Sequence, residues 1–379
     1  MTNVFTLLAG FSFLGWLYLT FFQGRFWQLL LPEPSPAPDT WPSVDIIVPA
    51  RNEAEALPLC LPSLLGQDYP GTWRVLLVDD HSTDNTAELA RGIAARKNAM
   101  ERLKIIAAPE KPADWSGKVA AMQAGVAQST ASYILFTDAD IWHPPDSLQK
   151  LVARATEQKL DLVSRMVKLH CVSAAERLLI PAFVFFFAML YPFRRANDAD
   201  SSVAAAAGGV MLVRREALDN AGGLAQIKSA LIDDCALARL IKSNGGNFRR
   251  TELTLSQDIR SLRDYPGTGD IWQMVARSAF TQLRHSALLL AGTVIGMGLL
   301  FLMPLLAIIF GNGFTVGIGL LSWLVMALLY MPMVGFYRLP RLWAFTLPFA
   351  AFIYIGATID SARLYWQGKG GQWKGRAQA

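Results

Sequence analysis

The chain has 379 residues, of which 53% are hydrophobic and only 17% are charged, with a net charge of +5. This balance is too apolar for an ordinary soluble enzyme, and the positive charge favours contact with anionic lipid and phosphate. Nothing in the sequence resembles a nucleic-acid-binding module. The three cysteines are widely spaced without a CxxC pair, which indicates a reducing compartment, and the four histidines lack metal-ligand spacing, so no zinc site is predicted.

Four apolar segments approach or exceed the length needed to cross a bilayer, which is about 20 residues. They are residues 4–22, 286–310, 314–336 and, marginally, 342–359. The first lacks the basic start and the cleavage site of a signal peptide, so an uncleaved anchor is predicted rather than a cleaved leader. We therefore expect an anchor at residues 1–24, a cytoplasmic body at 25–285, and a C-terminal membrane region with a basic tail at 286–379.

The orientation follows from the basic residues next to these segments, which are Arg25, Arg277, Arg284, Arg338 and Arg341. By the positive-inside tendency, they place the central body in the cytoplasm. The basic residues of the tail disagree if each segment crosses once: Arg363, Lys369, Lys374 and Arg376. Either segment 342–359, which Pro348 interrupts, is re-entrant, or the tail departs from the rule. We favour the re-entrant alternative.

After the anchor, the proline-rich residues 31–42 predict an extended linker. Short apolar strand signals follow at residues 44–50, 74–80, 103–109 and 132–140, and helical patterns lie between them around 57–65, 83–97 and 118–127. This alternation predicts a mostly parallel α/β sheet with helices on both faces. Ligands of such sheets bind at the carboxyl ends of the strands. The apolar residues 178–193 are either a buried core helix or an interfacial or re-entrant segment beside the acceptor site.

Two acidic clusters follow predicted strands. Asp138 and Asp140, in the sequence FTDAD, can share one divalent cation with phosphate oxygens of a substrate, or they can form a solvated turn. Asp80 can accept hydrogen bonds from a nucleotide base or ribose. The alternative for that cluster is helix capping, in which Ser82 or Thr83 begins the next helix.

Two further motifs are candidates for substrate contact. Lys118 follows Gly117 at the predicted start of a helix, where phosphate binds well, although a solvated surface lysine is an equal alternative. Asp233 and Asp234 precede an amphipathic helix, where acids either complement the helix dipole or act as a general base. The paired glycines 208 and 209 before an apolar strand allow close backbone approach to a substrate.

In chain order these motifs read PARNE, DD, GK, TDAD, GG and an acidic pair that begins a helix. From residue 1 to about 286, the chain resembles a membrane-bound inverting glycosyltransferase of family 2. The resemblance implies a GT-A (Rossmann-like) domain with N-terminal and C-terminal transmembrane helices. The chain is similar to ceramide glucosyltransferase-like enzymes and, among them, to the hopanoid (hopene)-associated bacterial group. The bacterial cytoplasmic (inner) membrane is then the expected location.

The resemblance implies roles for the matching residues. The nucleotide pocket would be lined by Pro49, Ala50, Arg51 and Glu53, with Asp80 on uracil. Lys118 would lie near the diphosphate, Asp138 and Asp140 would hold Mg²⁺ or Mn²⁺, and Asp234 would be the catalytic base. Relatives carry (Q/R)xxRW after the base, whereas this chain reads TQLRH at residues 281–285, so only Arg284 is kept to stabilise the departing diphosphate.

The predicted function is transfer of a sugar from a UDP-sugar to a membrane lipid, with inversion at the anomeric carbon. Two rival hypotheses stay open. A processive polysaccharide synthase would need a transmembrane channel, for which these segments are few. A non-catalytic nucleotide-sugar-binding protein would keep the fold without the chemistry.

Overall fold

The computed structural model describes residues 2–244, 250–370, 372–373 and 376–377. The chain forms two compact units, each assembled from segments that are distant in the sequence. The sheet unit consists of Leu30–His170, Arg195–Asp264 and Gln372–Ala379, and the helical unit of Met1–Leu29, Cys171–Arg194 and Tyr265–Gly371. The three consecutive domains expected from the sequence stay a prediction, because compactness alone does not define a functional boundary. Lys374 of the basic tail lies outside the described residues.

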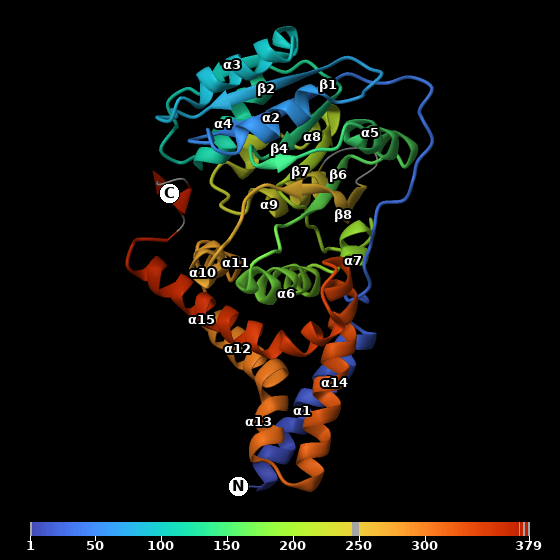
Figure 1. Ribbon diagram of the computed structural model, residues 1–379, viewed down its shortest axis with the longest axis vertical. Coiled ribbons are helices and arrows are strands. Elements are labelled where there is room, and N and C mark those ends of the chain that lie inside the picture. Colours follow the sequence, from blue (N-terminus) through green and yellow to red (C-terminus); the bar gives the residue numbers. More distant parts are fainter. Residues whose placement is uncertain (1, 245–249, 371, 374–375, 378–379) are drawn as a thin grey trace. The chain divides into compact units, whose positions relative to one another are not determined.

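The sheet unit is built on an eight-stranded sheet in the order β3-β2-β1-β4-β7-β6-β8-β5 (Figure 1). The strands are β1 Val44–Ala50, β2 Trp73–Asp79, β3 Leu103–Ala107, β4 Tyr133–Thr137, β5 Ile141–Trp142, β6 Leu162–Lys168, β7 Val210–Arg214 and β8 Thr251–Ser261. Strands β1 to β4 pair in parallel, as do β6 and β8, whereas β7 is antiparallel to both of its neighbours. The short β5 pairs antiparallel with β8. The predicted mostly parallel α/β sheet is confirmed.

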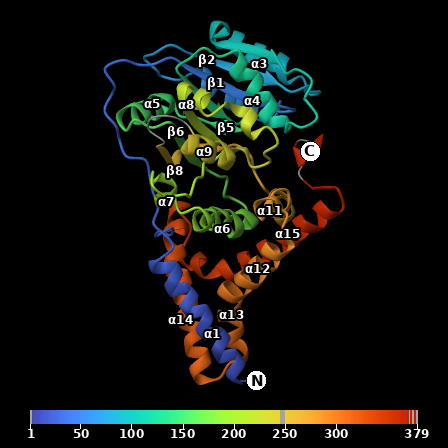
Figure 2. The ribbon, with the colours of Figure 1, turned by 180° about the vertical axis from the view of Figure 1, so that it is seen from behind.

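Helices cover both faces of this sheet (Figures 1 and 2). One layer contains α2 (Leu57–Leu65), α3 (Thr86–Arg96) and α5 (Ser147–Glu157), and the other contains α4 (Gly117–Ala127), α8 (Arg215–Asn220) and α9 (Asp233–Asn244). Successive side chains of a strand point to opposite faces. Ile46 and Val48 of β1 therefore pack into the first layer and Ile47 into the second. This two-sided burial explains why β1 is apolar at almost every position.

The start of α3 differs from the expectation. The helix begins at Thr86 after Asn85, which has a left-handed backbone (φ 63°) and makes no side-chain cap. The predicted capping by Ser82 or Thr83 was wrong, because these two side chains bond to the loop after β1 instead, while Asp84 Oδ1 accepts from the Thr86 N–H at 3.2 Å. Ser82 Oγ accepts a hydrogen bond from the Asn52 N–H (3.0 Å), and Asp84 Oδ2 accepts one from the Ala54 N–H (2.9 Å).

The helical unit contains long apolar helices: α1 (Thr2–Phe21), α12 (Ala287–Met297) continuing through a π-helical turn (Gly298–Leu302) into α13 (Met303–Phe310), α14 (Gly313–Phe336) and α15 (Leu347–Trp366). With these continuations, four helical segments among the described residues are long and apolar enough to cross a membrane. Helix α1 lies alongside α13 and α14 (Figure 2). Their length and apolar surface indicate a membrane protein.

Shorter helices complete the helical unit: α6 (Ala174–Leu190), α10 (Thr268–Ala276) and α11 (Ala279–Gln282). Helix α6 begins earlier than the predicted apolar segment, because Ser173 and Glu176 form a capping box at its start. The remaining short elements are α7 (Phe193–Asn197), which extends from the helical into the sheet unit, the 3₁₀ turns Met100–Arg102, Leu224–Ile227 and Arg341–Thr346, and the strands β9 (Gln372–Trp373) and β10 (Arg376–Ala377).

Candidate active site

The ends of several strands meet at one edge of the sheet. Because β1, β2 and β4 are parallel, their carboxyl ends lie on the same side, and the polar residues that follow them are brought to one edge. Strand β7 is antiparallel to β4, and its first residue Val210 pairs with Thr137, the last residue of β4. Gly208 and Gly209, which precede β7, therefore lie at the edge where Asp138 follows β4.

Lys118 lies at the centre of an acidic cluster at this edge. Its Nζ is 2.8 Å from Asp138 Oδ1 and 3.3 Å from Asp233 Oδ2. Gly208 lies beside both Lys118 and Asp234, since a Cβ added to Gly208 would be 3.3 Å from Lys118 Nζ and 3.4 Å from Asp234 Oδ2. The structure thus brings together a lysine and carboxylates from three separate segments of the sequence.

The electrostatics of the cluster favour charged partners. Burial by itself would lower the pKa of Lys118, but the carboxylates of Asp138, Asp233 and Asp234 outweigh burial and raise its pKa above the ordinary range. Burial and the neighbouring Asp233 carboxylate raise the pKa of Asp234 to about 6, against the opposing effect of Lys118. A carboxyl with this pKa is ionised at neutral pH and is still basic enough to accept a proton.

Two backbone N–H groups hold the carboxylate of Asp234. Gly208 N–H donates to Oδ2 at 2.9 Å, and Cys235 N–H donates to Oδ1 at 2.7 Å. Asp233 and Asp234 occupy the first turn of α9, where the unpaired N–H groups and the dipole of the helix favour negative charge. The orientation of the carboxylate is therefore fixed by α9 and by the glycine pair before β7.

A second polar group follows β1 and β2. Arg51 donates from Nη1 to the Asp80 carbonyl oxygen at 2.6 Å, and the same Nη1 is 3.6 Å from Asp80 Oδ2. The Asp80 N–H in turn donates to the Ala50 carbonyl at 2.8 Å, and the Glu53 N–H donates to Thr86 Oγ1 at 3.0 Å. Pro49 and Ala50 are the last, fully buried residues of β1. These bonds tie the loop after β1 to the loop after β2.

A buried hydrogen-bond chain supports the turn that carries Asp138. Thr137 Oγ1 donates to the Gly209 carbonyl at 2.7 Å and is 2.9 Å from His143 Nε2, while His143 Nδ1 is 2.9 Å from Ser147 Oγ. Because the Thr137 hydroxyl proton is used on Gly209, Thr137 accepts from Nε2–H, and Nδ1 accepts from Ser147. Burial lowers the pKa of His143 to about 3, so the ring is neutral. This chain joins the end of β4 to the glycine pair, and the sequence offered no signal for it beyond a lone histidine after the two acids.

The predicted site residues are therefore distributed as follows. Lys118, Asp138 and Asp234 form one cluster, to which the structure adds Asp233. Asp140 follows in the same turn, and its carbonyl accepts from the Leu262 N–H at 2.7 Å. Within the described part of the chain, no group of three His, Cys, Asp or Glu side chains is placed to hold a metal ion. Arg284 belongs to the helical unit, so its predicted role in the same site stays a prediction.

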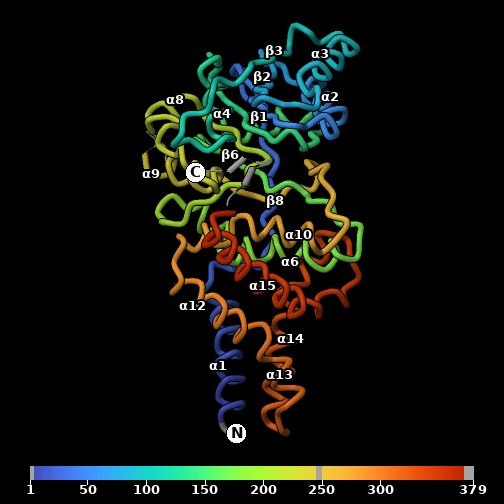
Figure 3. Tube along the Cα trace, turned by 90° about the vertical axis from the view of Figure 1, so that its left-hand side faces the viewer, coloured from blue at the N-terminus to red at the C-terminus, as the bar shows by residue number. Residues whose placement is uncertain are grey.

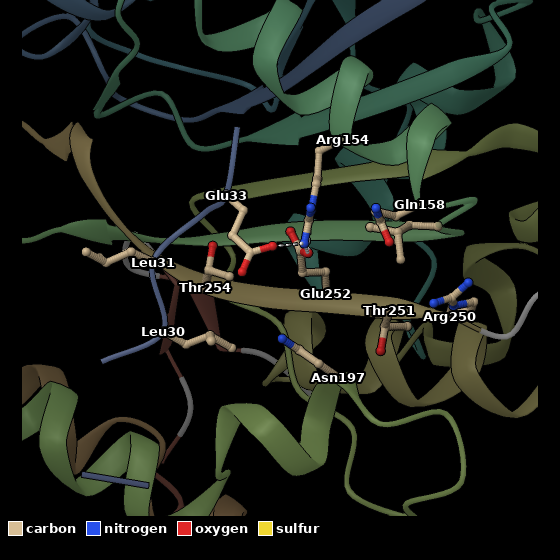
Figure 4. Close-up of a pocket in the computed structure, with 11 residues that line it drawn as sticks. Leu30, Leu31, Glu33, Arg154, Gln158, Asn197, Arg250, Thr251, Glu252 and Thr254 are labelled. Carbon is tan, nitrogen blue, oxygen red and sulfur yellow. Dashed lines mark hydrogen bonds and ion pairs between the residues drawn. The ribbon is translucent and has the colours of Figure 1, made fainter. Parts of the chain in front are cut away.

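A cavity of about 240 Å³ lies elsewhere in the sheet unit (Figure 4). It is bordered by the linker, the end of α5 and the start of β8, and includes the ion pairs of Arg154 with Glu252 (2.7 Å) and Glu33 (3.7 Å). The start of β8 pairs with the start of β6, which faces the end of β7, so this cavity is at the opposite edge of the sheet from Gly208. None of the predicted site residues lines it.

One known protein family resembles the part of the chain that contains most of the sheet unit. Residues 45–222, which include every strand and loop that forms the acidic cluster except α9, match the model of glycosyl transferase family 2. Just under half of the chain is thus similar to glycosyl transferase family 2. This agrees with the predicted resemblance to family 2. The predicted closeness to ceramide- or hopanoid-associated members of that family stays a prediction.

Characterised relatives align with part of this domain. The chain is 33% identical over 130 residues to the glycosyltransferase AglE of Haloferax volcanii, covering 34% of this chain and 40% of the relative. It is 33% identical over 124 residues to an N-acetylglucosaminyltransferase of Mesorhizobium japonicum, covering 32% of this chain and 28% of the relative. It is 31% identical over 116 residues to an undecaprenyl-phosphate 4-deoxy-4-formamido-L-arabinose transferase of Salmonella choleraesuis, covering 30% of this chain and 34% of the relative. The chain thus spans well under half of the length of these relatives.

Among solved structures, the chain resembles the mannosyltransferase PcManGT from Pyrobaculum calidifontis, determined in complex with GDP-Man and Mn²⁺. The TM-score is 0.61 at 19% sequence identity, and the superposition covers 97% of this chain and 100% of the other. At this identity the likeness establishes the fold, which is a GT-A α/β domain with apolar helices at its N-terminal and C-terminal ends.

Proposed function

We propose that the protein transfers a sugar from a nucleotide diphosphate sugar to a lipid acceptor in the membrane, by a single displacement with inversion. The observation that carries this proposal is the convergence of Lys118, Asp138 and Asp234 at one edge of the sheet in a glycosyl transferase family 2 domain. These groups supply what the reaction needs, namely positive charge near a diphosphate, a carboxylate for a cation, and a base for the acceptor.

The donor binds, in this proposal, across the loops after β1 and β2. Asp80, held by Arg51, accepts hydrogen bonds from the base, while the backbone of Pro49 and Ala50 and the side chain of Glu53 line the pocket. We assign the donor as a UDP-sugar. The structural relative was determined with GDP-Man, so competition between UDP and GDP for the purified protein tests this assignment directly.

A divalent cation, Mg²⁺ or Mn²⁺, fits the acidic side of the cluster. Asp138 and Asp140 are hard oxygen ligands that leave coordination positions for phosphate oxygens. Asp233 Oδ2 is a buried carboxylate oxygen that forms an ion pair with Lys118 at 3.3 Å, in a site that is rich in negative charge. When bound there, the cation would neutralise the negative charge that develops on the leaving diphosphate. The solved relative that contains Mn²⁺ agrees with this choice.

Asp234 is the proposed general base. Its raised pKa of about 6 leaves the carboxylate ionised at pH 7 to 8, and the N–H groups of Gly208 and Cys235 hold it in a fixed orientation. The carboxylate accepts the proton of the acceptor hydroxyl as that oxygen attacks the anomeric carbon. A phosphate acceptor is already ionised and would need no base. The arrangement therefore supports a hydroxyl acceptor, and we propose a hopanoid or a related lipid.

Arg284 is proposed to balance charge on the departing diphosphate. It lies in the TQLRH segment, where Arg284 and His285 both have left-handed backbones (φ 52° and 54°), a conformation that is costly for non-glycine residues. The ring of His285 stacks on Tyr365 with centroids 4.0 Å apart. His285 thus keeps an aromatic contact at the position where family members carry tryptophan.

The proposed location is the bacterial inner membrane, with the sheet unit in the cytoplasm. The uncharged residues 286–337 and the basic residues on either side of them support this orientation. Within the helical unit, α6 and the apolar helices are proposed to present the lipid.

The deciding experiment compares Asp234→Asn with the matched control Asp39→Asn, which changes an exposed carboxylate of the linker. Purified protein in lipid is supplied with UDP-sugars, and lipid products are identified by mass spectrometry. We expect Asp234→Asn to lose at least about 100-fold in turnover, with UDP binding unchanged. Equal loss of both would contradict the base role. A product with one sugar supports the proposal, a long chain indicates a processive synthase, and binding without turnover in the wild type indicates a non-catalytic protein.

A further inference from the structure

We propose that the segment from Arg341 to Trp366 does not cross the bilayer but is re-entrant, with both of its ends on the face where the chain enters the sheet unit. The exposed face of this segment contacts the layer of the bilayer where the lipid headgroups meet the acyl chains. The inference rests on the membrane location proposed above, but not on the proposed chemistry.

Three helical segments define the direction across the membrane. Thr6 of α1 bonds to Thr315 at the start of α14 (2.6 Å), and Phe5 packs near Phe310 at the end of α13. Further along α1, Trp16 Nε1 donates to the Leu300 carbonyl at 2.8 Å. The start of α1 and the α13–α14 turn therefore share one end of the helical unit, here called the far end (Figure 2).

The opposite end, here called the near end, is where the helical chain connects to the sheet unit. Helix α1 ends there at Phe21, shortly before the linker, and α14 ends there at Phe336. Helix α12 begins there at Ala287, since it runs antiparallel to α1. The chain passes between the two units after α1, on both sides of α6, before α10 and after α15.

The re-entrant segment begins at this end and returns to it. Its first part, the 3₁₀ turn Arg341–Thr346, follows the end of α14 by a short loop and turns back to the middle of that helix, where Trp323 Nε1 donates to the Phe345 carbonyl at 3.1 Å. Its last part packs on residues that directly precede α12. Phe280 N–H donates to Ser361 Oγ at 3.0 Å, and the His285 ring stacks on Tyr365. A segment that starts and ends at one side has not crossed.

The neighbours of the second half of α15 are polar. Asp360 accepts from Trp272 Nε1 at 2.9 Å and from Arg363 Nε at 2.7 Å. Trp272 lies in α10, which has only nine residues and carries Asp270 in its first turn. A crossing α15 would carry Asp360, Arg363 and α10 toward the hydrocarbon, where charged side chains are strongly disfavoured. Without this half, the apolar part of α15 is shorter than the about 20 residues that a span requires.

The face of α15 that the protein leaves uncovered is apolar. Phe349, Phe352 and Ile359 are 56%, 67% and 46% exposed, and their spacing places them on one side of the helix. Basic residues flank them, with Arg341 before the helix and Arg363 in its last turn. An apolar stripe between arginines is what an interfacial helix presents to a bilayer with anionic lipids. Figure 3 shows α15 beside α6 and α10, its partners within the helical unit.

This topology accounts for the charge of the tail. With three crossings, by α1, by α12–α13 and by α14, the residues after α15 stay on the same side as the sheet unit. Strands β9 and β10 belong to that unit. Arg363 and Lys369 then follow the positive-inside tendency instead of opposing it.

The test uses single cysteines in a Cys171→Ser background, because the other two cysteines are buried. Lys369→Cys reports the end of α15, Asn312→Cys the far end, and Glu88→Cys the sheet unit, all at exposed positions. A membrane-impermeant maleimide is applied to spheroplasts and to inverted vesicles of a bacterial host. We expect Lys369→Cys and Glu88→Cys to react in one preparation and Asn312→Cys in the other. Reaction of Lys369→Cys together with Asn312→Cys overturns the proposal.

A second measurement tests the depth of the segment. A spin label at Phe352→Cys is expected to be relaxed by lipid-soluble oxygen far more than by a water-soluble nickel chelate, whereas the label at Glu88→Cys shows the reverse. Equal nickel accessibility at both positions would contradict burial of this face in lipid. Neither readout requires turnover, so a failure of the proposed sugar transfer leaves both outcomes interpretable.

Discussion

Lys118 Nζ lies 2.8 Å from Asp138 Oδ1, so the lysine expected at the diphosphate is paired with the acid expected at the cation. Both residues belong to the sheet unit, and Asp233 completes the contact at 3.3 Å. A cation that binds Asp138 must compete with the ammonium group for the same carboxylate. If a cation binds Asp138 as proposed, we expect Lys118 to be released from that carboxylate and to turn toward phosphate.

Replacing Lys118 by methionine should strengthen binding of Mn²⁺ alone, on the order of tenfold, because the competing positive charge is removed. Binding of the nucleotide diphosphate should weaken at the same time. Electron paramagnetic resonance of free Mn²⁺ measures the first effect and calorimetry with UDP measures the second. Lys104→Met, at an exposed lysine bonded to Gln128, serves as the control. Unchanged Mn²⁺ affinity in Lys118→Met would argue against the competition.

The activity should fall on the acidic side with an apparent pKa near 6, because Asp234 must be ionised to accept a proton. Part of this raised pKa comes from the Asp233 carboxylate. Removing that charge in Asp233→Asn lowers the pKa of Asp234, so the acidic limb of the kcat/KM profile should move to lower pH. The exposed Asp219→Asn variant should leave the limb in place. A limb that moves to higher pH in Asp233→Asn would refute the assignment.

His143 should make the protein less stable in acid. Its pKa of about 3 in the folded protein lies below the ordinary 6.5, so between these values the unfolded chain binds the extra proton. The contribution of neutral His143 to the free energy of unfolding is fully present above pH 6.5 and is lost as the pH falls. At pH 5 the free energy of unfolding is lower by about 2 kcal/mol for this reason. His143→Asn should therefore lose less stability between pH 7.5 and 5 than the wild type. His81→Asn, at an exposed left-handed position, should behave as the wild type in the same thermal unfolding series.

Gly208→Ala should impair turnover more than folding. The added Cβ would approach Lys118 Nζ and Asp234 Oδ2 at 3.3 and 3.4 Å, which disturbs the charged groups but not the packed core. We expect a lower kcat with an unfolding temperature within a few degrees of the wild type. Gly125→Ala is the opposite case, because its Cβ would lie 2.5 Å from Ile47 Cγ2 in the core. If Gly208→Ala lowers stability as much as Gly125→Ala, the glycine has a structural role instead.

The order of strands and helices from residue 44 to residue 140 was predictable because it depends on local patterns. Buried parallel strands are apolar throughout, so the apolar residues 44–50 predict β1. The first helix was predicted at the residues of α2, despite Pro62 in its interior. Helix starts are less readable from sequence, since they depend on where polar side chains find partners. Asp84 bonds to the Ala54 N–H across the loops, and α3 begins three residues later than expected.

The sequence by itself determined that this is a membrane-associated α/β chain with acids and a lysine after its strands. This is because burial and the repeat of strands and helices fix the order of apolar and polar residues along the chain. The tertiary structure decided which of those groups meet. Asp138, Asp233 and Lys118 are separated by long stretches of chain, and their contact follows from the antiparallel pairing of β7 with β4 and from the position of α9. It also placed the last turns of α15 against the residues that precede α12, since the bond from Phe280 to Ser361 joins residues that no local pattern relates.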